Sequence, residues 1–318
     1  MYMKKIAALF PGQGSQQMHM GVDLYRNFLC AREVYDEIDH ILKRSLSKII
    51  FSGNIIDLSA IINIQLAITS TSIAITKVLC FLANKKFSEI FTVIAGHSLG
   101  EYTALYLGHS INIDSIVKLL QYRGHAMSAA VHGAHGTMHS LLENNLGKIL
   151  QFCANLSKYG LCQLSNDNGA GQNIISGHNT SFVYIYPYTR LFKISKAVQL
   201  PVNIPFHSNV MQIATGIMTN ILKQHIIDLP NIYMFANLNA SIYKNIVNVT
   251  TLLGQQVINK VKWRQVIDKM YHNIGCRVFV EIGPGNIISN LLKRQYGDIR
   301  IYTLSNIADI RKFLDIEF

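Results

Sequence analysis

The chain has 318 residues, of which 49% are hydrophobic and 15% charged, so it is long and apolar enough to bury a core, and intrinsic disorder is excluded. Its formal net charge is +11, but the cations are scattered and not interleaved with aromatic residues, which argues against a nucleic-acid partner. The five cysteines form no CxxC pair, which excludes a disulfide framework or zinc ribbon and favours a reduced, cytoplasmic protein. An AT-biased composition would explain the excess charge, and so would an acidic partner or an anionic substrate; both explanations can hold at once.

The N-terminal element is predicted as a core strand followed by a glycine-rich loop. Residues 1–10 imitate a signal peptide, but the apolar run at 6–10 is short and Pro11-Gly12 ends it, so 4–10 is predicted as the strand. The loop at 11–16 lacks the Lys-Ser/Thr ending of a phosphate-binding loop. Its backbone N–H groups would suit one half of an oxyanion hole.

Two helical regions are predicted next. Residues 23–50 have the charged, solvated face of a surface helix. Residues 64–82 are apolar, but they include Gln65, Lys77 and several Thr and Ser side chains. That composition favours a buried helix over a membrane span, and no membrane association is expected.

The clearest chemical signal lies between residues 91 and 107. A strand is predicted over 91–95 and a helix over 99–107, with Gly96-His97-Ser98-Leu99-Gly100 between them. A GxSxG pattern between strand and helix is the signature of a nucleophile elbow, whose sharp turn exposes the serine. Glycine is needed on both sides because a side chain there would collide with the neighbouring strand or helix. Ser98 is therefore the candidate nucleophile, at a helix N-terminus that favours developing negative charge.

Beyond the elbow, a helix at 113–130 carries Arg123, and the alternation of strands and helices predicts an α/β protein with a parallel sheet. Residues 132–199 contain short strand-like pieces at 161–164, 173–176 and 192–200, and they predict a small inserted α+β unit. The large catalytic subdomain would then be 1–131 and 200–318. Four histidines lie close together near this boundary: His125, His132, His135 and His139. Two glycines interrupt the run, so no metal site is predicted.

The C-terminal third returns to the main body. The predicted elements are a helix ending at 225, a strand near 232–237, a helix over 252–270, a last strand at 277–282 and a helix over 287–294. No internal repeats are found.

A serine nucleophile needs a base within hydrogen-bond reach. His207 is the candidate, in a proline-flanked loop beside Phe206. An α/β-hydrolase triad would need an acid after Ser98 and a late histidine. Asp228 or Asp268 with His272 makes no good triad, which favours a Ser–His pair whose imidazole is held by a carbonyl oxygen.

Five stretches together resemble the malonyl-CoA:acyl carrier protein transacylases of bacterial fatty acid synthesis. In family order they are Phe10-Pro11-Gly12-Gln13-Gly14-Ser15-Gln16, Gly96-His97-Ser98-Leu99-Gly100-Glu101-Tyr102, Arg123-Gly124, Pro205-Phe206-His207-Ser208 and Glu281-Ile282-Gly283-Pro284-Gly285. The resemblance spans nearly the whole chain. It implies an α/β-hydrolase-like large subdomain with a ferredoxin-like insert.

The resemblance also implies roles for individual residues. Ser98 would be the nucleophile and His207 its base, with the backbone N–H groups of Gln13 and Leu99 as the oxyanion hole. Arg123 would bind the malonyl carboxylate. The backbone carbonyl of Gln256 would orient the histidine. Asn166, Asn168 and Gln172 would line the substrate site on the side of the insert. Phe206 would either leave little room for an α-methyl branch of the acyl group or only pack the core. Lys193 and Lys196 are candidates for contact with the acidic carrier protein.

The implied reaction is ping-pong transfer of malonyl from malonyl-CoA to the pantetheine thiol of acyl carrier protein, with no cofactor, in a cytoplasmic monomer. The chain departs from the family pattern at His19, Leu66, residues 137–140 and residues 169–171, which affects loops and packing rather than the reacting residues. Three alternatives stay open: a serine hydrolase, a non-enzymatic descendant of the family, and the acyltransferase portion of a polyketide synthase.

Overall fold

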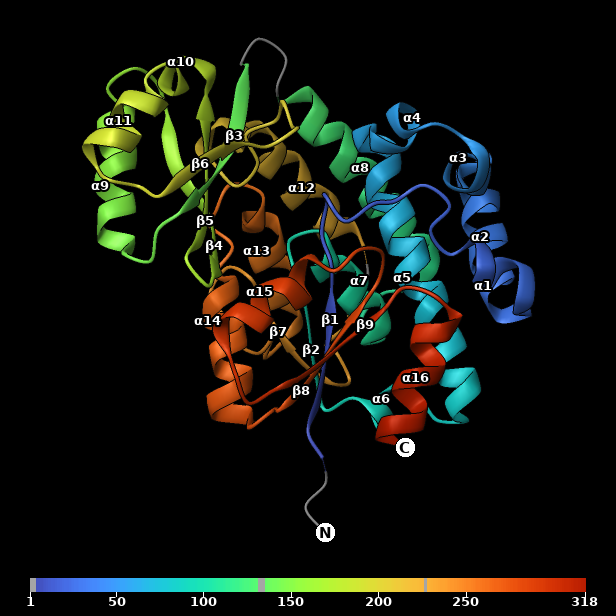
Figure 1. Ribbon diagram of the computed structural model, residues 1–318. Coiled ribbons are helices and arrows are strands. Elements are labelled where there is room, and N and C mark those ends of the chain that lie inside the picture. The colour runs from blue at the N-terminus through green and yellow to red at the C-terminus, as the bar shows by residue number, and fades with distance from the viewer. Residues whose placement is uncertain (1–3, 131–134, 226–227) are drawn as a thin grey trace.

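The computed structural model describes residues 4–130, 135–225 and 228–318. These residues form two units, each built on its own sheet, and the smaller unit lies at one end of the larger (Figure 1). The smaller sheet lies wholly between residues 136 and 199, inside the predicted insert. The predicted boundary at 131/132, like His132, lies outside the described residues and stays a prediction.

The large unit contains a five-stranded sheet in which every neighbouring pair is parallel. In spatial order its strands are β7 (Tyr233–Phe235), β2 (Val93–Gly96), β1 (Ile6–Phe10), β8 (Val278–Ile282) and β9 (Arg300–Leu304). Along β1 the side chains alternate between two cores: Ala8 and Phe10 face one, and Ala7 and Leu9 face the other. Because both faces of the strand are buried, helices must cover both sides of the sheet, as predicted.

The helices of the large unit are grouped on these two faces (Figure 1). They are α1 (Val22–Asn27), α2 (Leu29–Leu42), α3 (Leu46–Ser52), α4 (Ile55–Ser59), α5 (Ile61–Ala83), α6 (Phe87–Ile90), α7 (Gly100–Leu107), α8 (Ile113–Ala129), α12 (Gln212–Gln224), α13 (Ile246–Gln256), α14 (Trp263–Lys269), α15 (Ile287–Gln295) and α16 (Ile307–Glu317). A short 3₁₀ turn, Asn209–Met211, precedes α12, and a π-helical turn, Met270–Ile274, extends α14.

The long apolar helix α5 is the one described helix that could span a membrane by length and composition. In the fold it packs against α2 and α8, and 72% of its most apolar window is buried inside the protein. The predicted buried helix is confirmed, with Gln65 fully buried inside it.

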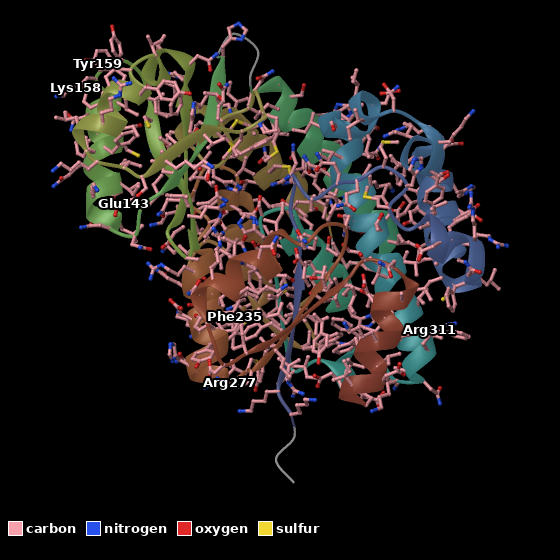
Figure 2. All side chains as sticks on the ribbon, viewed as in Figure 1. Glu143, Lys158, Tyr159, Phe235, Arg277 and Arg311 are labelled. Carbon is pink, nitrogen blue, oxygen red and sulfur yellow. The ribbon has the colours of Figure 1, made fainter. Side chains whose placement is uncertain are left out.

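The insert is a ferredoxin-like unit, as the resemblance implied. Its elements are β3 (Gly136–Leu142), α9 (Leu146–Leu156), β4 (Cys162–Gly169), β5 (Gln172–His178), α10 (Asn179–Phe182), α11 (Ile185–Leu191) and β6 (Lys196–Gln199). The sheet is antiparallel with the order β4-β5-β3-β6, the arrangement of a βαββαβ motif. Figure 2 shows Lys158 and Tyr159 at its outer end, whereas Phe235 lies inside the large unit.

Three sequence-based boundaries are wrong. The helix predicted over 23–50 is three helices, because Phe28 is extended (φ −130°) and Lys43 is left-handed (φ 53°). The helix predicted over 252–270 is interrupted between α13 and α14, where Val261 leaves the helical path to pair with Asn166 of β4. The strand at 277–282 is not the last, since β9 and α16 follow it.

Candidate active site

The elbow forms where β2 turns into α7, and its glycines are sterically required. A Cβ atom on Gly96 would lie 1.8 Å from the Gly100 carbonyl carbon, and one on Gly100 would lie 2.1 Å from the Phe10 carbonyl oxygen. Ser98 itself adopts a left-handed backbone conformation (φ 51°), which is strained for a side chain other than glycine. This tight turn presents the Ser98 hydroxyl at the carboxyl end of the sheet.

Ser98 and His207 meet although 109 positions separate them. The Ser98 hydroxyl donates to His207 Nε2 across 2.8 Å, and His207 Nδ1 donates to the Gln256 carbonyl oxygen across 2.8 Å. This hydrogen bond fixes the tautomer that leaves Nε2 free to accept the serine proton. The predicted arrangement, a Ser–His pair held by a carbonyl rather than by an acid, is what the structure contains.

His207 is buried, and burial is the main reason that its pKa falls to about 3. The nearby Arg123 guanidinium lowers this pKa further, against the hydrogen bond to Gln256, which raises it. The imidazole is therefore neutral at neutral pH, the state that a general base needs.

Arg123 extends from α8 to the serine and is also buried. Its Nη1 donates to Gln65 Oε1 across 2.8 Å, and its Nη2 lies 3.3 Å from Ser98 Oγ. Its Nε has no partner, and no carboxylate of the described residues lies within salt-bridge distance of it. A buried guanidinium without a counter-ion is a ready site for an anionic group of a ligand.

The backbone N–H groups around Ser98 are unequally available. The Ser98 N–H donates to Asn237 Oδ1 across 2.7 Å, whereas the Leu99 N–H donates to no acceptor among the described residues. The Gln13 loop lies against the elbow, since a Cβ atom on Gly12 would lie 2.6 Å from the His97 carbonyl oxygen. Leu99 and Gln13 therefore stay the predicted oxyanion donors.

The asparagines of β4 lie where the insert meets the elbow. Asn168 Oδ1 accepts from His97 Nε2 across 2.8 Å, and Asn168 Nδ2 donates to Gln172 Oε1 across 2.9 Å. Asn166 pairs with Val261 through the backbone. These contacts join the two units, and a substrate contact for the three residues stays a prediction.

Three predicted residues remain, one of them in the core and two on the surface of the insert. Phe206 is buried in the core cluster on the α5 side of the sheet, so packing accounts for it and its effect on branched acyl groups stays a prediction. Lys193 and Lys196 are exposed on the insert, just before and at the start of β6.

Sequence reasoning missed Asn237, which holds the elbow, and the role of Gln65, which holds Arg123. Asn237 follows β7, the neighbour of β2, so it reaches the same edge of the sheet. Polar residues directly after parallel strands are the signal that would have found it. Gln65 shows no such signal, because a buried glutamine in an apolar helix looks the same whatever it contacts.

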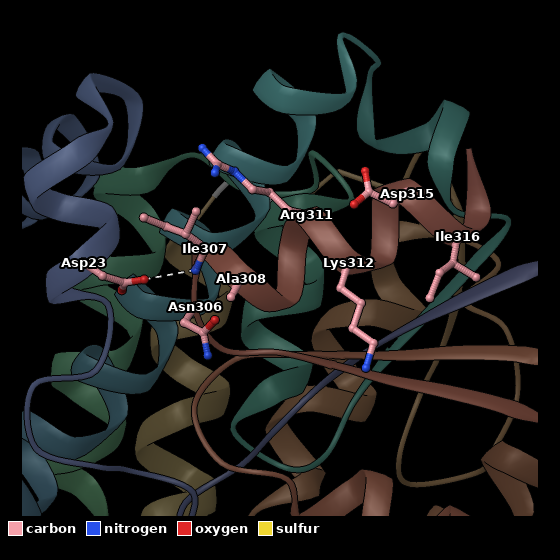
Figure 3. Close-up of a pocket in the computed structure, with 8 residues that line it drawn as sticks. All are labelled: Asp23, Asn306, Ile307, Ala308, Arg311, Lys312, Asp315 and Ile316. Carbon is pink, nitrogen blue, oxygen red and sulfur yellow. Dashed lines mark hydrogen bonds between the residues drawn. The ribbon is translucent and has the colours of Figure 1, made fainter.

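Two hollows in the described surface lie away from Ser98 and His207. One runs beside α16, where Asp23 accepts a hydrogen bond from the Ile307 N–H (Figure 3). The other lies between the insert and α15, beside Asn173 and Arg264. Neither includes a predicted catalytic residue.

Comparison with known proteins identifies the family. Residues 8–309 match the model of the acyl transferase domain, so the chain belongs to the acyltransferase family. Malonyl CoA-acyl carrier protein transacylase of Bacillus subtilis (strain 168) is 33% identical over 92% of this chain and 90% of its own length. The corresponding enzyme of Haemophilus influenzae is 28% identical over 96% of this chain and 97% of its own. The crystal structure of acyl-carrier-protein S-malonyltransferase from Bartonella henselae superposes with a TM-score of 0.92 at 34% identity, covering 98% of this chain and 99% of that one.

Proposed function

We propose that this protein transfers malonyl from malonyl-CoA to acyl carrier protein through a malonyl ester of Ser98. One observation carries the proposal: Ser98 Oγ lies within hydrogen-bond distance of both a neutral base, His207, and an unpaired buried cation, Arg123. The base serves acyl transfer in general, and the cation selects an acyl group that ends in a carboxylate. Relatives similar over the full chain carry the same activity in their names.

In the first half-reaction, His207 Nε2 takes the Ser98 proton as Oγ attacks the thioester carbonyl carbon. The N–H groups of Leu99 and Gln13 stabilise the oxyanion, and one such donor typically contributes about 3–4 kcal/mol. The carbon–sulfur bond then breaks, and CoA leaves as a thiol with the proton from His207. Malonyl is left as an ester on Ser98.

In the second half-reaction, the pantetheine thiol of the carrier protein gives its proton to His207, and its sulfur attacks the ester carbonyl. Ser98 Oγ leaves with that proton, so the enzyme returns to its starting state. This is ping-pong catalysis. Each half-reaction uses the same base and the same oxyanion donors, because the two thioesters are chemically alike.

The central experiment is intact-mass measurement after mixing with malonyl-CoA, for the wild type and Ser98→Ala. We expect a malonyl-sized gain in the wild type alone, and that gain should disappear when the holo carrier protein is added. Loss of the adduct at the same rate with and without a thiol acceptor would indicate a serine hydrolase instead.

Arg123 can be tested as the malonyl-selecting residue by comparing transfer of malonyl and acetyl groups. An acetyl group leaves the buried guanidinium unpaired, whereas malonyl supplies two charge-assisted hydrogen bonds. Arg123→Ala should therefore lower the rate of malonyl transfer and raise the ratio of acetyl transfer to malonyl transfer. An unchanged preference for malonyl would contradict the assignment.

The surface of the insert offers a basic face for the carrier protein. The insert carries two acidic residues, and each is already paired with a cation: Glu143 with Lys148 and Asp167 with Arg264. Lys193 and Lys196 are therefore placed to attract an acidic partner. Lys196→Glu should raise the apparent KM for the carrier protein and leave that for malonyl-CoA unchanged. Lys158→Glu, at the outer end of the insert, is the control, and equal effects of the two changes would refute the assignment.

The working form that we propose is a cytoplasmic monomer that needs no cofactor. The support for the absence of a cofactor is chemical, since the thioester is already activated and only protons and the acyl group pass between protein and substrate. Sedimentation at working concentration tests the monomer, and activity after exhaustive chelation tests the absence of a metal cofactor. A concentration-dependent dimer or a loss of activity on chelation would contradict them.

A further inference from the structure

A buried carboxylate contacts the residues that hold the Ser98–His207 pair and takes no part in the proposed reaction steps. Glu101, in the first turn of α7, is 1% exposed. Its side chain accepts hydrogen bonds from the Tyr243 hydroxyl, from Gln256 Nε2 and from the Asn237 backbone N–H, the last across 3.2 Å. The amide NH₂ and the backbone N–H can only donate, and the hydroxyl donates here too, so the arrangement suits an ionised carboxylate, which only accepts.

The partners of Glu101 are the residues that hold the reacting pair. Gln256 gives its backbone carbonyl to His207 Nδ1 across 2.8 Å, and its side-chain amide donates to the Ser98 carbonyl across 3.0 Å as well as to Glu101. Asn237 accepts from the Ser98 N–H and donates to the Gly96 carbonyl, each across 2.7 Å. One carboxylate therefore fixes both the residue that orients the base and the residue that braces the nucleophile.

We propose that Glu101 is a positioning residue for acyl transfer: it locks Gln256 and Asn237 so that the His207 imidazole and the Ser98 hydroxyl stay aligned. The inference rests on the proposed roles of Ser98 and His207. In a triad the acid contacts the histidine directly. Here the Gln256 carbonyl contacts the histidine, and Glu101 contacts the Gln256 side chain instead of the histidine.

An isosteric amide cannot replace this carboxylate. Glu101→Gln would bring an NH₂ group against a partner that also donates, and two donors cannot bond to each other. The amide of Gln256 would then turn or shift, and the carbonyl that holds His207 would move with it. The expected loss is about 10- to 100-fold in the acylation rate, as for outer-shell partners at metal sites.

The ionisation of Glu101 supplies a readout that a purely structural role would not give. The groups facing it are the hydroxyls of Tyr243 and Tyr102, the Arg123 guanidinium and, through Gln256, the His207 imidazole. Burial raises the pKa of Glu101 to about 7, against its hydrogen bonds and Arg123, which lower it. A proton taken up there would displace one of the three donors. Wild-type acylation should therefore slow as the pH falls through about 7, and Glu101→Gln should lack that inflection.

The experiment is single-turnover acylation of the full chain by malonyl-CoA from pH 5.5 to 9, with thermal unfolding of each variant. Glu101→Gln should acylate more slowly with a nearly unchanged half-saturating concentration, because the hydrogen bonds of Arg123 are to Gln65 and Ser98 and not to Glu101. Tyr243→Phe should show a smaller loss of the same kind. The matched control is Tyr35→Phe, which removes another buried hydroxyl, bonded to Thr71 Oγ1 across 3.1 Å, and should acylate like the wild type.

Normal acylation by folded Glu101→Gln, or a raised half-saturating concentration with an unchanged rate, would overturn the inference. If Glu101→Gln fails to fold, the acylation rates of Tyr243→Phe and Tyr35→Phe are compared instead. Equal rates for these two variants would overturn the inference. Absence of a malonyl-enzyme even in the wild type would instead overturn the proposed function and this inference with it.

Discussion

Arg123 depends on a second buried side chain for its place beside Ser98. Gln65, in the core of α5, accepts from Nη1 across 2.8 Å, and the guanidinium also lies over the Tyr102 ring, 5.4 Å from its centroid. Burial lowers the pKa of Arg123, although a guanidinium stays charged at any working pH. Gln65 therefore holds the charge that we propose binds the malonyl carboxylate.

Gln65→Leu should raise the KM for malonyl-CoA by about tenfold, since a hydrogen bond to a charged group is worth about 1.5–3 kcal/mol. The ratio of malonyl transfer to acetyl transfer should also fall, because a guanidinium that Gln65 no longer holds can turn away from Ser98. Steady-state kinetics with both thioesters measure this. Thr76→Val, which removes only a bond to the Ser72 carbonyl within α5, is the control. An unchanged KM in Gln65→Leu would contradict the assignment.

The strand–elbow–helix element is set by close backbone contact. Gly100 lies directly against the carbonyl of Phe10, the last residue of β1, and a Cβ atom there would be 2.1 Å from that oxygen. Such an overlap can be relieved only by moving α7 away from the sheet. The GxSxG spacing is therefore a packing requirement as well as a catalytic one.

Gly100→Ala should lower the unfolding free energy by about 1–3 kcal/mol or more, the range for overpacked sites. Gly216→Ala is the opposite case, because nothing lies within 4 Å of the added Cβ in the exposed part of α12. It should stabilise by about 0.4–1 kcal/mol by reducing the freedom of the unfolded chain. Urea unfolding of both variants measures these changes, and equal effects would contradict the packing argument.

His139 on β3 gives the insert a specific sensitivity to acid. Its ring stacks on Phe182 with centroids 4.5 Å apart, its Nδ1 has no partner, and burial lowers its pKa to about 4. The folded protein therefore holds it neutral, whereas the unfolded chain takes up a proton at its ordinary pKa of 6.5. Its contribution to stability is present above pH 6.5 and is lost as the pH falls toward 4.

His139→Leu should remove this dependence. The difference in unfolding free energy between variant and wild type should stay constant above pH 7 and shift in favour of the variant between pH 6.5 and about 4. Urea unfolding at pH 7.5 and pH 5 checks this. A difference that does not change with pH would show that the ring titrates alike in both states.

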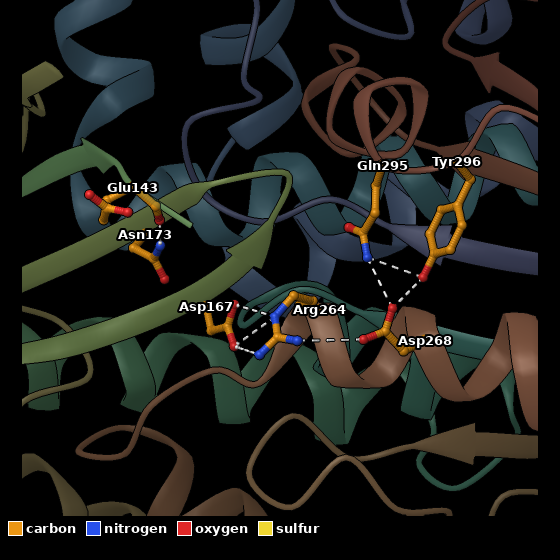
Figure 4. Close-up of polar contacts among 7 residues, drawn as sticks. All are labelled: Glu143, Asp167, Asn173, Arg264, Asp268, Gln295 and Tyr296. Atoms are coloured by element: carbon orange, nitrogen blue, oxygen red, sulfur yellow. Dashed lines mark hydrogen bonds and ion pairs between the residues drawn. The ribbon is translucent and has the colours of Figure 1, made fainter. Parts of the chain in front are cut away.

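At the scale of the whole molecule, the insert is tied to the large unit by a continuous set of contacts. β4 pairs with Val261 of the large unit, and Arg264 of α14 binds the buried Asp167 through three hydrogen bonds (Figure 4). The His97–Asn168 bond then links the insert directly to the elbow. The position of the insert relative to the elbow therefore depends on this joint, and so does the proposed substrate site beside Ser98.

Asp167→Asn should lower the unfolding free energy by about 1–3 kcal/mol, less than the 3–5 kcal/mol typical of a fully buried pair, because Arg264 is 35% exposed. Amide exchange in β4 should accelerate, while exchange in β1 should not. Asp114→Asn, which breaks an exposed pair with Lys118, should change stability by less than about 0.5 kcal/mol. Equal losses in the two variants would show that the joint does not depend on this ion pair.

The sequence by itself determined the α/β class and the nucleophile elbow at Ser98, and it predicted the roles of His207 and Arg123, the latter through the family resemblance. Local rules set these features: the GxSxG turn needs its glycines, and motif order specifies the family. Alternating apolar segments likewise predict a covered parallel sheet. The breaks at Phe28 and Lys43 escaped prediction because no glycine or proline marks them, and the break at Val261 because its pairing with the distant Asn166 decides it.

Only the tertiary structure decided which polar residues support the reacting pair. Gln65, Asn237, Tyr243 and Glu101 come from separate segments, and their hydrogen-bond partners lie up to 155 positions away. Asn237 is marked only by its position after a parallel strand, and no local pattern distinguishes a buried glutamine that holds a reacting group from one that does not. Their roles follow from desolvation, because a polar group enclosed by the fold must find a partner there, and the folded chain fixes which partner that is.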